Sequence, residues 1–97
     1  MYLEHMVERT PIPVERIQTG VRMEKRLVKV LKGLAEYHDM SLGDLLEGIV
    51  LHAFEGKGPF GRESLQKIVE LRQVYGLDLD SSASHRLTEV RKSRGRS

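Results

Sequence analysis

Hydrophobic and polar side chains alternate along the stretch RIQTGVRM, residues 16–23. One set of alternate positions is mainly apolar and consists of Ile17, Thr19, Val21 and Met23. The other set is polar or small and consists of Arg16, Gln18, Gly20 and Arg22. A repeat of two residues is typical of a half-buried β-strand, because successive side chains of a strand point to opposite faces. The pattern therefore predicts a strand over residues 16–23, and no other stretch of the chain predicts a second one.

From Glu24 onward the hydrophobic repeat changes to three and four residues, which is the spacing of one face of an α-helix. This spacing predicts helices over residues 24–38, 41–55, 64–75 and 81–92. The helix expected at 41–55 is the most apolar of the four, so we expect it to be buried on more than one side.

Particular residues mark the ends of these helices. Ser41 and Asp44, in the stretch SLGD, indicate a capping box, in which the serine hydroxyl accepts a hydrogen bond from a first-turn amide and the Asp44 side chain reaches back to the cap. Gly76 is typical of the left-handed residue that ends a helix. Gly33 lies inside the first helix, where glycine costs about 1 kcal/mol relative to alanine, unless it allows a neighbouring helix to pack closely.

The charges are segregated along the chain. Residues 16–32 contain six Lys or Arg against one Glu, a net charge of +5, whereas residues 33–55 contain five acids and no Lys or Arg, a net charge of −5. Segregated positive charge is typical of proteins that bind a polyanion, although a solvated helix face beside an acidic one has the same pattern.

Several classes of protein do not fit the sequence. The chain of 97 residues has no cysteine, which removes disulfides and thiolate metal sites and suits a cytoplasmic protein. None of its four histidines forms an i, i+4 pair on one helix, so we expect no metal and no cofactor. No nucleophile is visibly paired with a base, so we expect no catalytic residues and no enzyme. No stretch reaches the roughly 20 apolar residues that span a membrane.

A single strand leaves its backbone N–H and C=O groups unpaired. Because nothing adjacent in the sequence returns as its partner, we expect the strand to pair with the same strand of a second copy about a two-fold axis. This arrangement also accounts for the apolar helix at 41–55, which would bury its surface against its twin.

The order of strand, basic helix and Ser-capped apolar helix resembles the ribbon-helix-helix superfamily of DNA-binding proteins, the MetJ/Arc group, over about residues 15–55. The resemblance implies a mainly α ribbon-helix-helix fold, in which one N-terminal strand pairs with its two-fold mate in an intertwined homodimer, followed here by two C-terminal helices. The predicted segments are an N-terminal arm at 1–15, a DNA-binding and dimerisation domain at 16–55, a helical extension at 56–92 and a basic tail at 93–97.

The resemblance also implies which residues contact DNA. In the family a two-stranded ribbon enters the major groove and its outer face reads base edges, which here corresponds to Gln18, Gly20 and Arg22. Gly20 departs from the family pattern because it has no side chain. The start of the second helix is expected to hold a phosphate. The expected phosphate contacts are Ser41, Leu42 and Gly43, together with Arg16, Lys25, Arg26 and Lys29. The expected dimer core is Thr19, Val21, Met23, Leu45, Leu46, Ile49 and Val50.

The sequence thus predicts a homodimeric transcriptional repressor that binds double-stranded DNA, with neighbouring dimers able to assemble along it. Two alternatives remain open at this point. One is an antitoxin-like protein, in which residues 56–97 bind a toxin as protein partner. The other is a dimeric protein-interaction module without DNA binding, which Gly20 and the acidic second helix favour.

Overall fold

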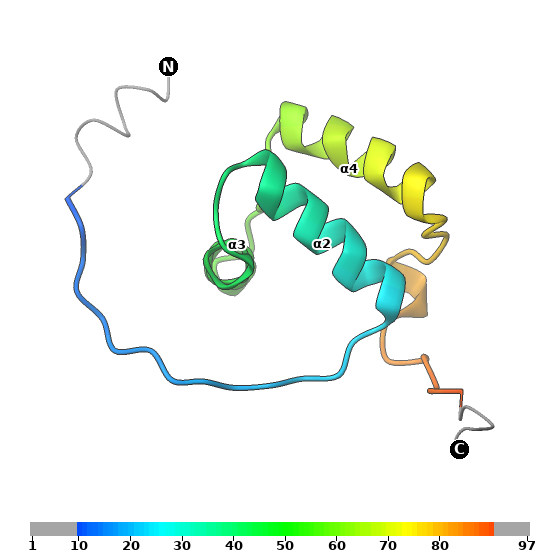
Figure 1. Cartoon of the computed structure of the whole chain (residues 1–97), viewed down its shortest axis with the longest axis horizontal. Helices are drawn as coiled ribbons and strands as arrows, with labels where there is room; N and C mark the ends of the chain where they lie inside the picture. Colours follow the sequence, from blue (N-terminus) through cyan, green and yellow to red (C-terminus); the bar gives the residue numbers. More distant parts are fainter. Residues whose placement is uncertain (1–9, 91–97) are drawn as a thin grey trace.

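The structure is a computed structural model that describes residues 10–90. This part of the chain contains three α-helices, which are α2 (Lys25–Tyr37), α3 (Leu42–Phe54) and α4 (Arg62–Tyr75), followed by the short 3₁₀ helix η1 (Ser81–Ala83). In Figure 1, α2 and α4 run side by side while α3 is viewed along its axis. Residues 10–24 precede α2 as a long extended segment that passes beneath α3 in this view.

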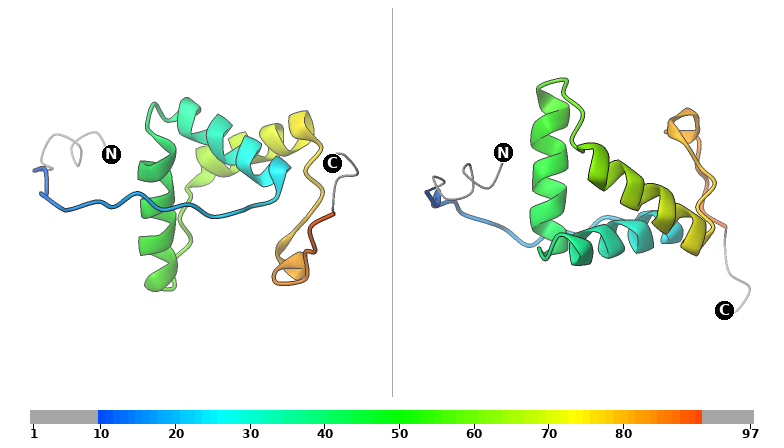
Figure 2. Two further views of the ribbon diagram at one scale, coloured as in Figure 1. Left: turned by 60° about the horizontal axis from the view of Figure 1, so that its bottom comes forward. Right: turned by 90° about the horizontal axis from the view of Figure 1, so that it is seen from above.

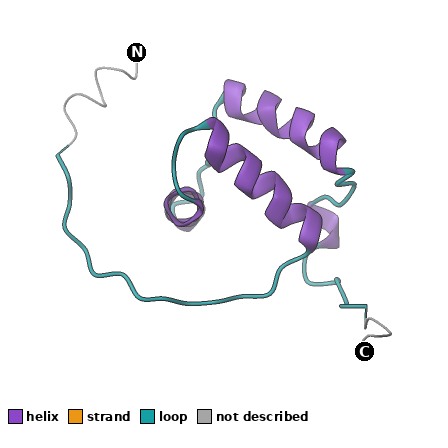
Figure 3. Ribbon diagram, in the orientation of Figure 1, coloured by secondary structure: helices purple, strands orange, loops and turns teal. Residues whose placement is uncertain are grey.

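The expected strand is wrong, and with it the ribbon-helix-helix fold. Residues 10–90 contain no β-strand, as the absence of strand colour in Figure 3 shows, although the fold is mainly α. Residues 16–23 are extended but form no backbone hydrogen bond within the described part of the chain. The physical reason is that a strand is defined by its hydrogen-bonded neighbour, and the described part of the chain provides no neighbour for this segment.

Helix α2 begins and ends close to the predicted positions. The Glu24 carboxylate caps its first turn, where Oε1 accepts a hydrogen bond from the amide of Leu27 at 3.0 Å. The helix is followed by His38 and by Asp39, which has a positive φ of 60° and turns the chain toward α3.

Helix α3 confirms the serine half of the predicted capping box, whereas the Asp44 carboxylate accepts no hydrogen bond from the Ser41 amide within the described residues. The hydroxyl of Ser41 accepts a hydrogen bond from the amide of Asp44 at 3.0 Å. Because Asp44 lies in the first turn, its negative charge also faces the positive end of the helix dipole. Figure 2 shows α3 standing across α2, so that only one side of α3 can pack against the other helices.

The core lies where the three helices meet. Leu34 and Ala35 of α2 and Leu45 of α3 are buried, with Ile68 and Leu71 of α4 packed against them. An added Cβ on Gly33 would lie 2.9 Å from Leu71 Cδ2, so this glycine allows α4 to approach α2 closely. Of the two interpretations of Gly33 from sequence, the close-packing one is therefore confirmed.

The C-terminal part contradicts the fourth predicted helix. Gly76 ends α4 in the left-handed conformation, with φ of 66°, as predicted. Beyond it, only the single turn Ser81–Ala83 is helical among the described residues of 81–92. His85 has a positive φ of 66°, a backbone conformation that does not continue a helix. Leu77 is nonetheless buried and anchors this segment to the helices.

The predicted arm and tail lie partly outside the described residues, because the structure describes neither 1–9 nor 91–97. Within 10–90, no helix is both long enough and apolar enough to cross a membrane.

Candidate nucleic-acid interface

The extended segment keeps the alternation that is visible in the sequence. Ile17 and Val21 project from it with 87% and 76% of their surface exposed. The polar set of Arg16, Gln18 and Arg22 is also exposed. Since its backbone forms no hydrogen bond within the described residues, the segment presents polar side chains, apolar side chains and backbone groups together.

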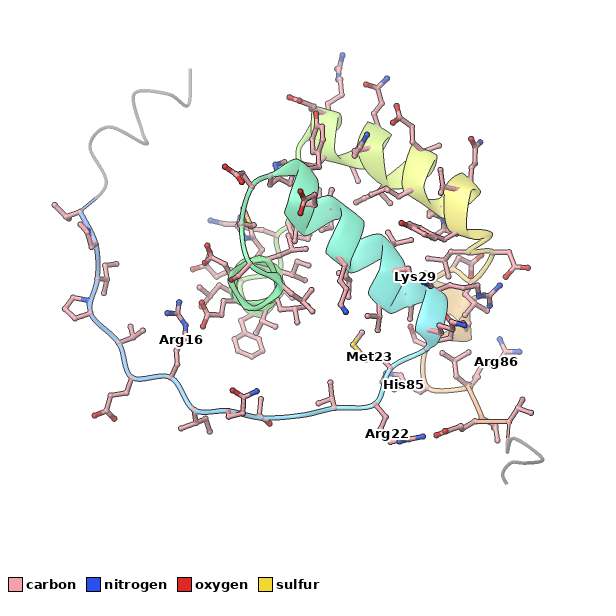
Figure 4. The ribbon with its side chains drawn as sticks, viewed as in Figure 1. Arg16, Arg22, Met23, Lys29, His85 and Arg86 are labelled. Atoms are coloured by element: carbon pink, nitrogen blue, oxygen red, sulfur yellow. The ribbon has the colours of Figure 1, made fainter. Side chains whose placement is uncertain are left out.

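Arg16 ties the extended segment to α3. Its guanidinium makes a bidentate contact with the Glu47 carboxylate, in which Nε donates to Oε2 at 2.8 Å and Nη2 donates to Oε1 at 2.7 Å. Figure 4 shows Arg16 pointing from the extended segment toward α3. The hydrogen bond from Arg16 and its positive charge lower the pKa of the Glu47 carboxyl. Arg16, one of the expected phosphate contacts, is therefore paired with a carboxylate of the same chain.

Arg22 makes a similar contact with a distant part of the chain. Nε donates to Oε1 of Glu89 at 3.1 Å, and Nη2 donates to Oε2 of the same carboxylate. Both side chains are largely exposed, at 81% and 65%. The hydrogen bond from Arg22 and its charge lower the pKa of Glu89. The side chain predicted to read guanine is thus paired with a carboxylate 67 residues further along the chain.

Gln18 and Gly20, the other two predicted base contacts, have open surroundings. The Gln18 side chain has no hydrogen-bond partner within residues 10–90. A Cβ added to Gly20 would meet no atom within 4 Å. The gap that Gly20 leaves in the polar set is therefore not filled by a neighbouring side chain.

The basic residues at the start of α2 have different surroundings. Arg26 donates to Glu24 at 2.9 Å, to the carbonyl of Gly76 at 2.9 Å and to Asp78 at 3.0 Å. Lys29 lies 5.7 Å from the centre of the Tyr75 ring, a cation–π contact. Lys25 is exposed and forms no ion pair within the described part of the chain. Arg26 is therefore mainly a structural link between α2 and the segment after α4.

The amino end of α3 presents two backbone donors. The amides of Leu42 and Gly43 have no acceptor among the described residues, because they belong to the first turn, while Ser41 caps the amide of Asp44. Lys25 is the first residue of α2, whereas Ser41 follows the last turn of this helix. The structure thus separates Lys25 from the amino end of α3 by the length of α2, about 20 Å.

The expected dimer-core residues fall into two groups. Leu45 is buried within the single chain and Ile49 packs against the same core. By contrast, Val50 is 43% exposed, Val21 76% and Met23 43%, while Leu46 is half-buried and Thr19 is exposed.

The predicted dimer core left out the two most exposed apolar side chains of α3. Leu51 is 63% exposed and Phe54 is 81% exposed. We call Leu46, Val50, Leu51 and Phe54 the α3 apolar surface. Beside it lies a groove that the extended segment helps to line, with Ile12 and Val14 opposite Leu46, Val50 and Leu51. The sequence signal for this surface is that apolar residues run around most of α3.

Two of the histidines have hydrogen-bonding partners within the described residues. His38 Nε2 lies 2.8 Å from Ser64 Oγ, and His52 Nδ1 lies 2.8 Å from the carbonyl of Gly48, one turn earlier. Within residues 10–90, no cluster of His, Asp and Glu is arranged to hold a metal ion.

We found no match to this chain among protein-family models, curated proteins or solved structures. The resemblance to the ribbon-helix-helix superfamily therefore stays a prediction, and the strand that it implies is missing from the described residues.

Proposed function

We propose that this protein binds double-stranded DNA as a homodimer and represses transcription by occupying a promoter. The observation that carries this proposal is the extended segment at residues 16–23, whose alternate polar side chains are exposed and whose backbone is unpaired within residues 10–90. It leads directly into α2, so the six Lys and Arg of residues 16–32 follow one another along a single stretch of the chain.

The chemistry of this region suits DNA. Arg22 can donate two hydrogen bonds to O6 and N7 of guanine, and Gln18 can bond N6 and N7 of adenine. Each such pair contributes about 1–3 kcal/mol of discrimination between bases. Lys25, together with the amides of Leu42 and Gly43, would contact phosphates near opposite ends of α2 and so orient the protein on the duplex. Binding through phosphates weakens as salt is added, because releasing condensed counterions into a more concentrated salt solution gains less entropy.

The α3 apolar surface supports the homodimer. Contiguous exposed apolar side chains on a soluble protein usually mark an interface, and Phe54 is 81% exposed in the single chain. A second copy supplies an identical apolar surface, so a two-fold contact would bury Leu46, Val50, Leu51 and Phe54 of both chains together. Two-fold symmetry would also place two Arg22 side chains on a partly palindromic DNA site.

Selection of bound sequences from a random pool of DNA duplexes tests the proposed function. We expect a partly palindromic sequence to be enriched, with affinity falling steeply between a low and a high salt concentration. Binding that enriches no sequence at either salt concentration would contradict sequence-specific regulation. A complete lack of binding at low salt would contradict DNA binding altogether.

A second candidate is a dimeric protein-interaction module. The observation in its favour is that both arginines of the extended segment are already paired, Arg16 with Glu47 and Arg22 with Glu89. In this function the apolar side chains Ile17 and Val21, rather than the arginines, would contact a partner. The same selection separates the two functions, because the interaction module enriches no DNA sequence.

A further inference from the structure

The segment after α4 is held against the start of α2 by several specific contacts. Leu77 is only 6% exposed. Arg26 donates to the carbonyl of Gly76 at 2.9 Å and to Asp78 at 3.0 Å, and Arg72 donates to the carbonyl of Leu79 at 2.8 Å. These contacts fix the point from which the chain continues to residue 90.

The chain beyond this anchor is also locally ordered by side chains. The carboxylate of Asp80 accepts a hydrogen bond from the amide of Ser82 at 2.9 Å, which starts the single helical turn. Arg86 donates to the carbonyl of Ser82 at 2.9 Å. The segment then runs back to the extended segment, where Glu89 meets Arg22, and Figure 4 shows Arg22 beside it.

The contact at Arg22 uses the donors that base recognition needs. Nε and Nη2 both point at the Glu89 carboxylate. A guanine edge offers two acceptors, O6 and N7, to a bidentate arginine, as a carboxylate offers its two oxygens. Glu89 therefore occupies an edge of the guanidinium with which Arg22 could bind guanine.

We propose that residues 77–90 regulate DNA binding as an intramolecular competitor, in which the Glu89 carboxylate occupies Arg22 until a guanine displaces it. This inference rests on the proposed DNA-binding function. The Arg22–Glu89 contact is a weak competitor, because both side chains are largely exposed and an exposed ion pair contributes little free energy. It therefore weakens binding at sites where Arg22 must leave Glu89 to bond guanine, and leaves binding that does not use Arg22 unchanged.

The test uses the full chain with Glu89→Gln, which keeps the shape of the side chain and removes its charge. The first measurement is the NMR signal of the Arg22 Nε–H group in the protein without DNA. We expect this signal to shift and its exchange with water to accelerate in Glu89→Gln. An unchanged signal would overturn the proposal without touching DNA binding, because it would show that the contact is not formed in solution.

The second measurement is affinity for the DNA duplex that selection enriches, compared with a random duplex pool. We expect Glu89→Gln to bind the enriched duplex about two- to five-fold more tightly, the range for an exposed ion pair. The matched control is Glu70→Gln, because the Glu70 side chain is also 65% exposed but pairs with Lys67. An equal gain in Glu70→Gln would overturn the proposal in favour of a general effect of net charge.

A double-mutant cycle separates a direct from an indirect effect of Glu89. In an Arg22→Ala background we expect Glu89→Gln to leave DNA affinity unchanged, because the competed donor is gone. A gain that persists in this background would overturn the proposal. If neither the unmodified chain nor Glu89→Gln binds any duplex at low salt, the proposed function itself fails, and the regulation fails with it.

Discussion

Arg22 has the central role at the scale of single residues. It is the side chain best suited to bond a guanine edge, yet in the free chain it is paired with Glu89. The two roles are compatible because the pair is exposed and therefore exchanges easily with a competing acceptor.

Replacing Arg22 with alanine should remove sequence discrimination. We expect Arg22→Ala to lose about 1–3 kcal/mol of preference for the enriched duplex over a random pool, while most of the salt-dependent background remains. Titration of both duplexes measures this difference. Arg62→Ala, an exposed arginine on α4, serves as control and should leave the preference unchanged. An equal loss on both duplexes in Arg22→Ala would show that Arg22 is only an electrostatic contact.

The contact between Arg16 and Glu47 predicts a pH dependence. Arg16 lowers the pKa of Glu47 in the folded chain, so the contact stabilises the docked extended segment above the ordinary carboxyl pKa of about 4.3. That stability is lost as the pH falls through the lowered pKa and Glu47 becomes protonated. NMR titration of the Glu47 carboxyl should give a higher pKa in Arg16→Gln than in the unmodified chain. Arg62→Gln should leave it unchanged, and an unshifted pKa in Arg16→Gln would contradict the contact.

At the scale of elements, the approach of α4 to α2 depends on a glycine. A methyl group on Gly33 would lie 2.9 Å from Leu71 Cδ2, whereas a methyl group on Gly48 of α3 would meet no atom within 4 Å. Gly33 and Gly48 therefore have the same unfavourable helix propensity relative to alanine, but different surroundings.

Alanine substitutions should separate these two effects. Gly48→Ala should raise the free energy of unfolding by about 1 kcal/mol through helix propensity alone. Gly33→Ala should show little of this gain, because Leu71 must move to make room. In a Leu71→Ala background the gain of Gly33→Ala should reappear, as measured by urea unfolding. A full gain from Gly33→Ala in the unmodified chain would contradict the close approach of the two helices.

At the scale of the whole molecule, the α3 apolar surface and the extended segment are what a single chain leaves uncovered. Phe54, Leu51 and Ile17 are all more than half exposed. A domain of this size buries only a modest part of its apolar surface by itself, so association with a second copy would supply what the fold lacks.

Sedimentation equilibrium should detect the proposed dimer. The unmodified chain should sediment as a dimer. Phe54→Ser combined with Leu51→Gln should shift it toward a monomer, because the dimer would then bury polar groups in its interface. Val74→Ser on α4 is the matched control, because Val74 is 71% exposed and lies outside the α3 apolar surface. A folded monomer in the unmodified chain would contradict the homodimer.

Local patterns predicted the helices that have strong signals. The repeat of three and four residues placed α2, α3 and α4, and Ser41 and Gly76 marked ends that the structure confirms. The prediction failed at residues 16–23 because the alternation of apolar and polar residues shows only that the two faces of an extended segment differ in polarity. It does not show whether a neighbouring strand is present to form hydrogen bonds. The prediction failed again at 81–92, where three apolar positions are too few to stabilise a short helix by packing against the rest of the molecule.

The sequence by itself determined the elements whose stability is local, together with the segregation of charge that suggests a polyanion partner. Only the tertiary structure decided which charges meet. Arg16 pairs with Glu47, which lies 31 residues further along the chain, and Arg22 pairs with Glu89, which lies 67 residues further along. No pattern of sequence spacing connects positions so far apart. The tertiary structure also decided that one side of α3 is buried and another exposed, because α2 covers only part of a helix that is apolar around most of its surface.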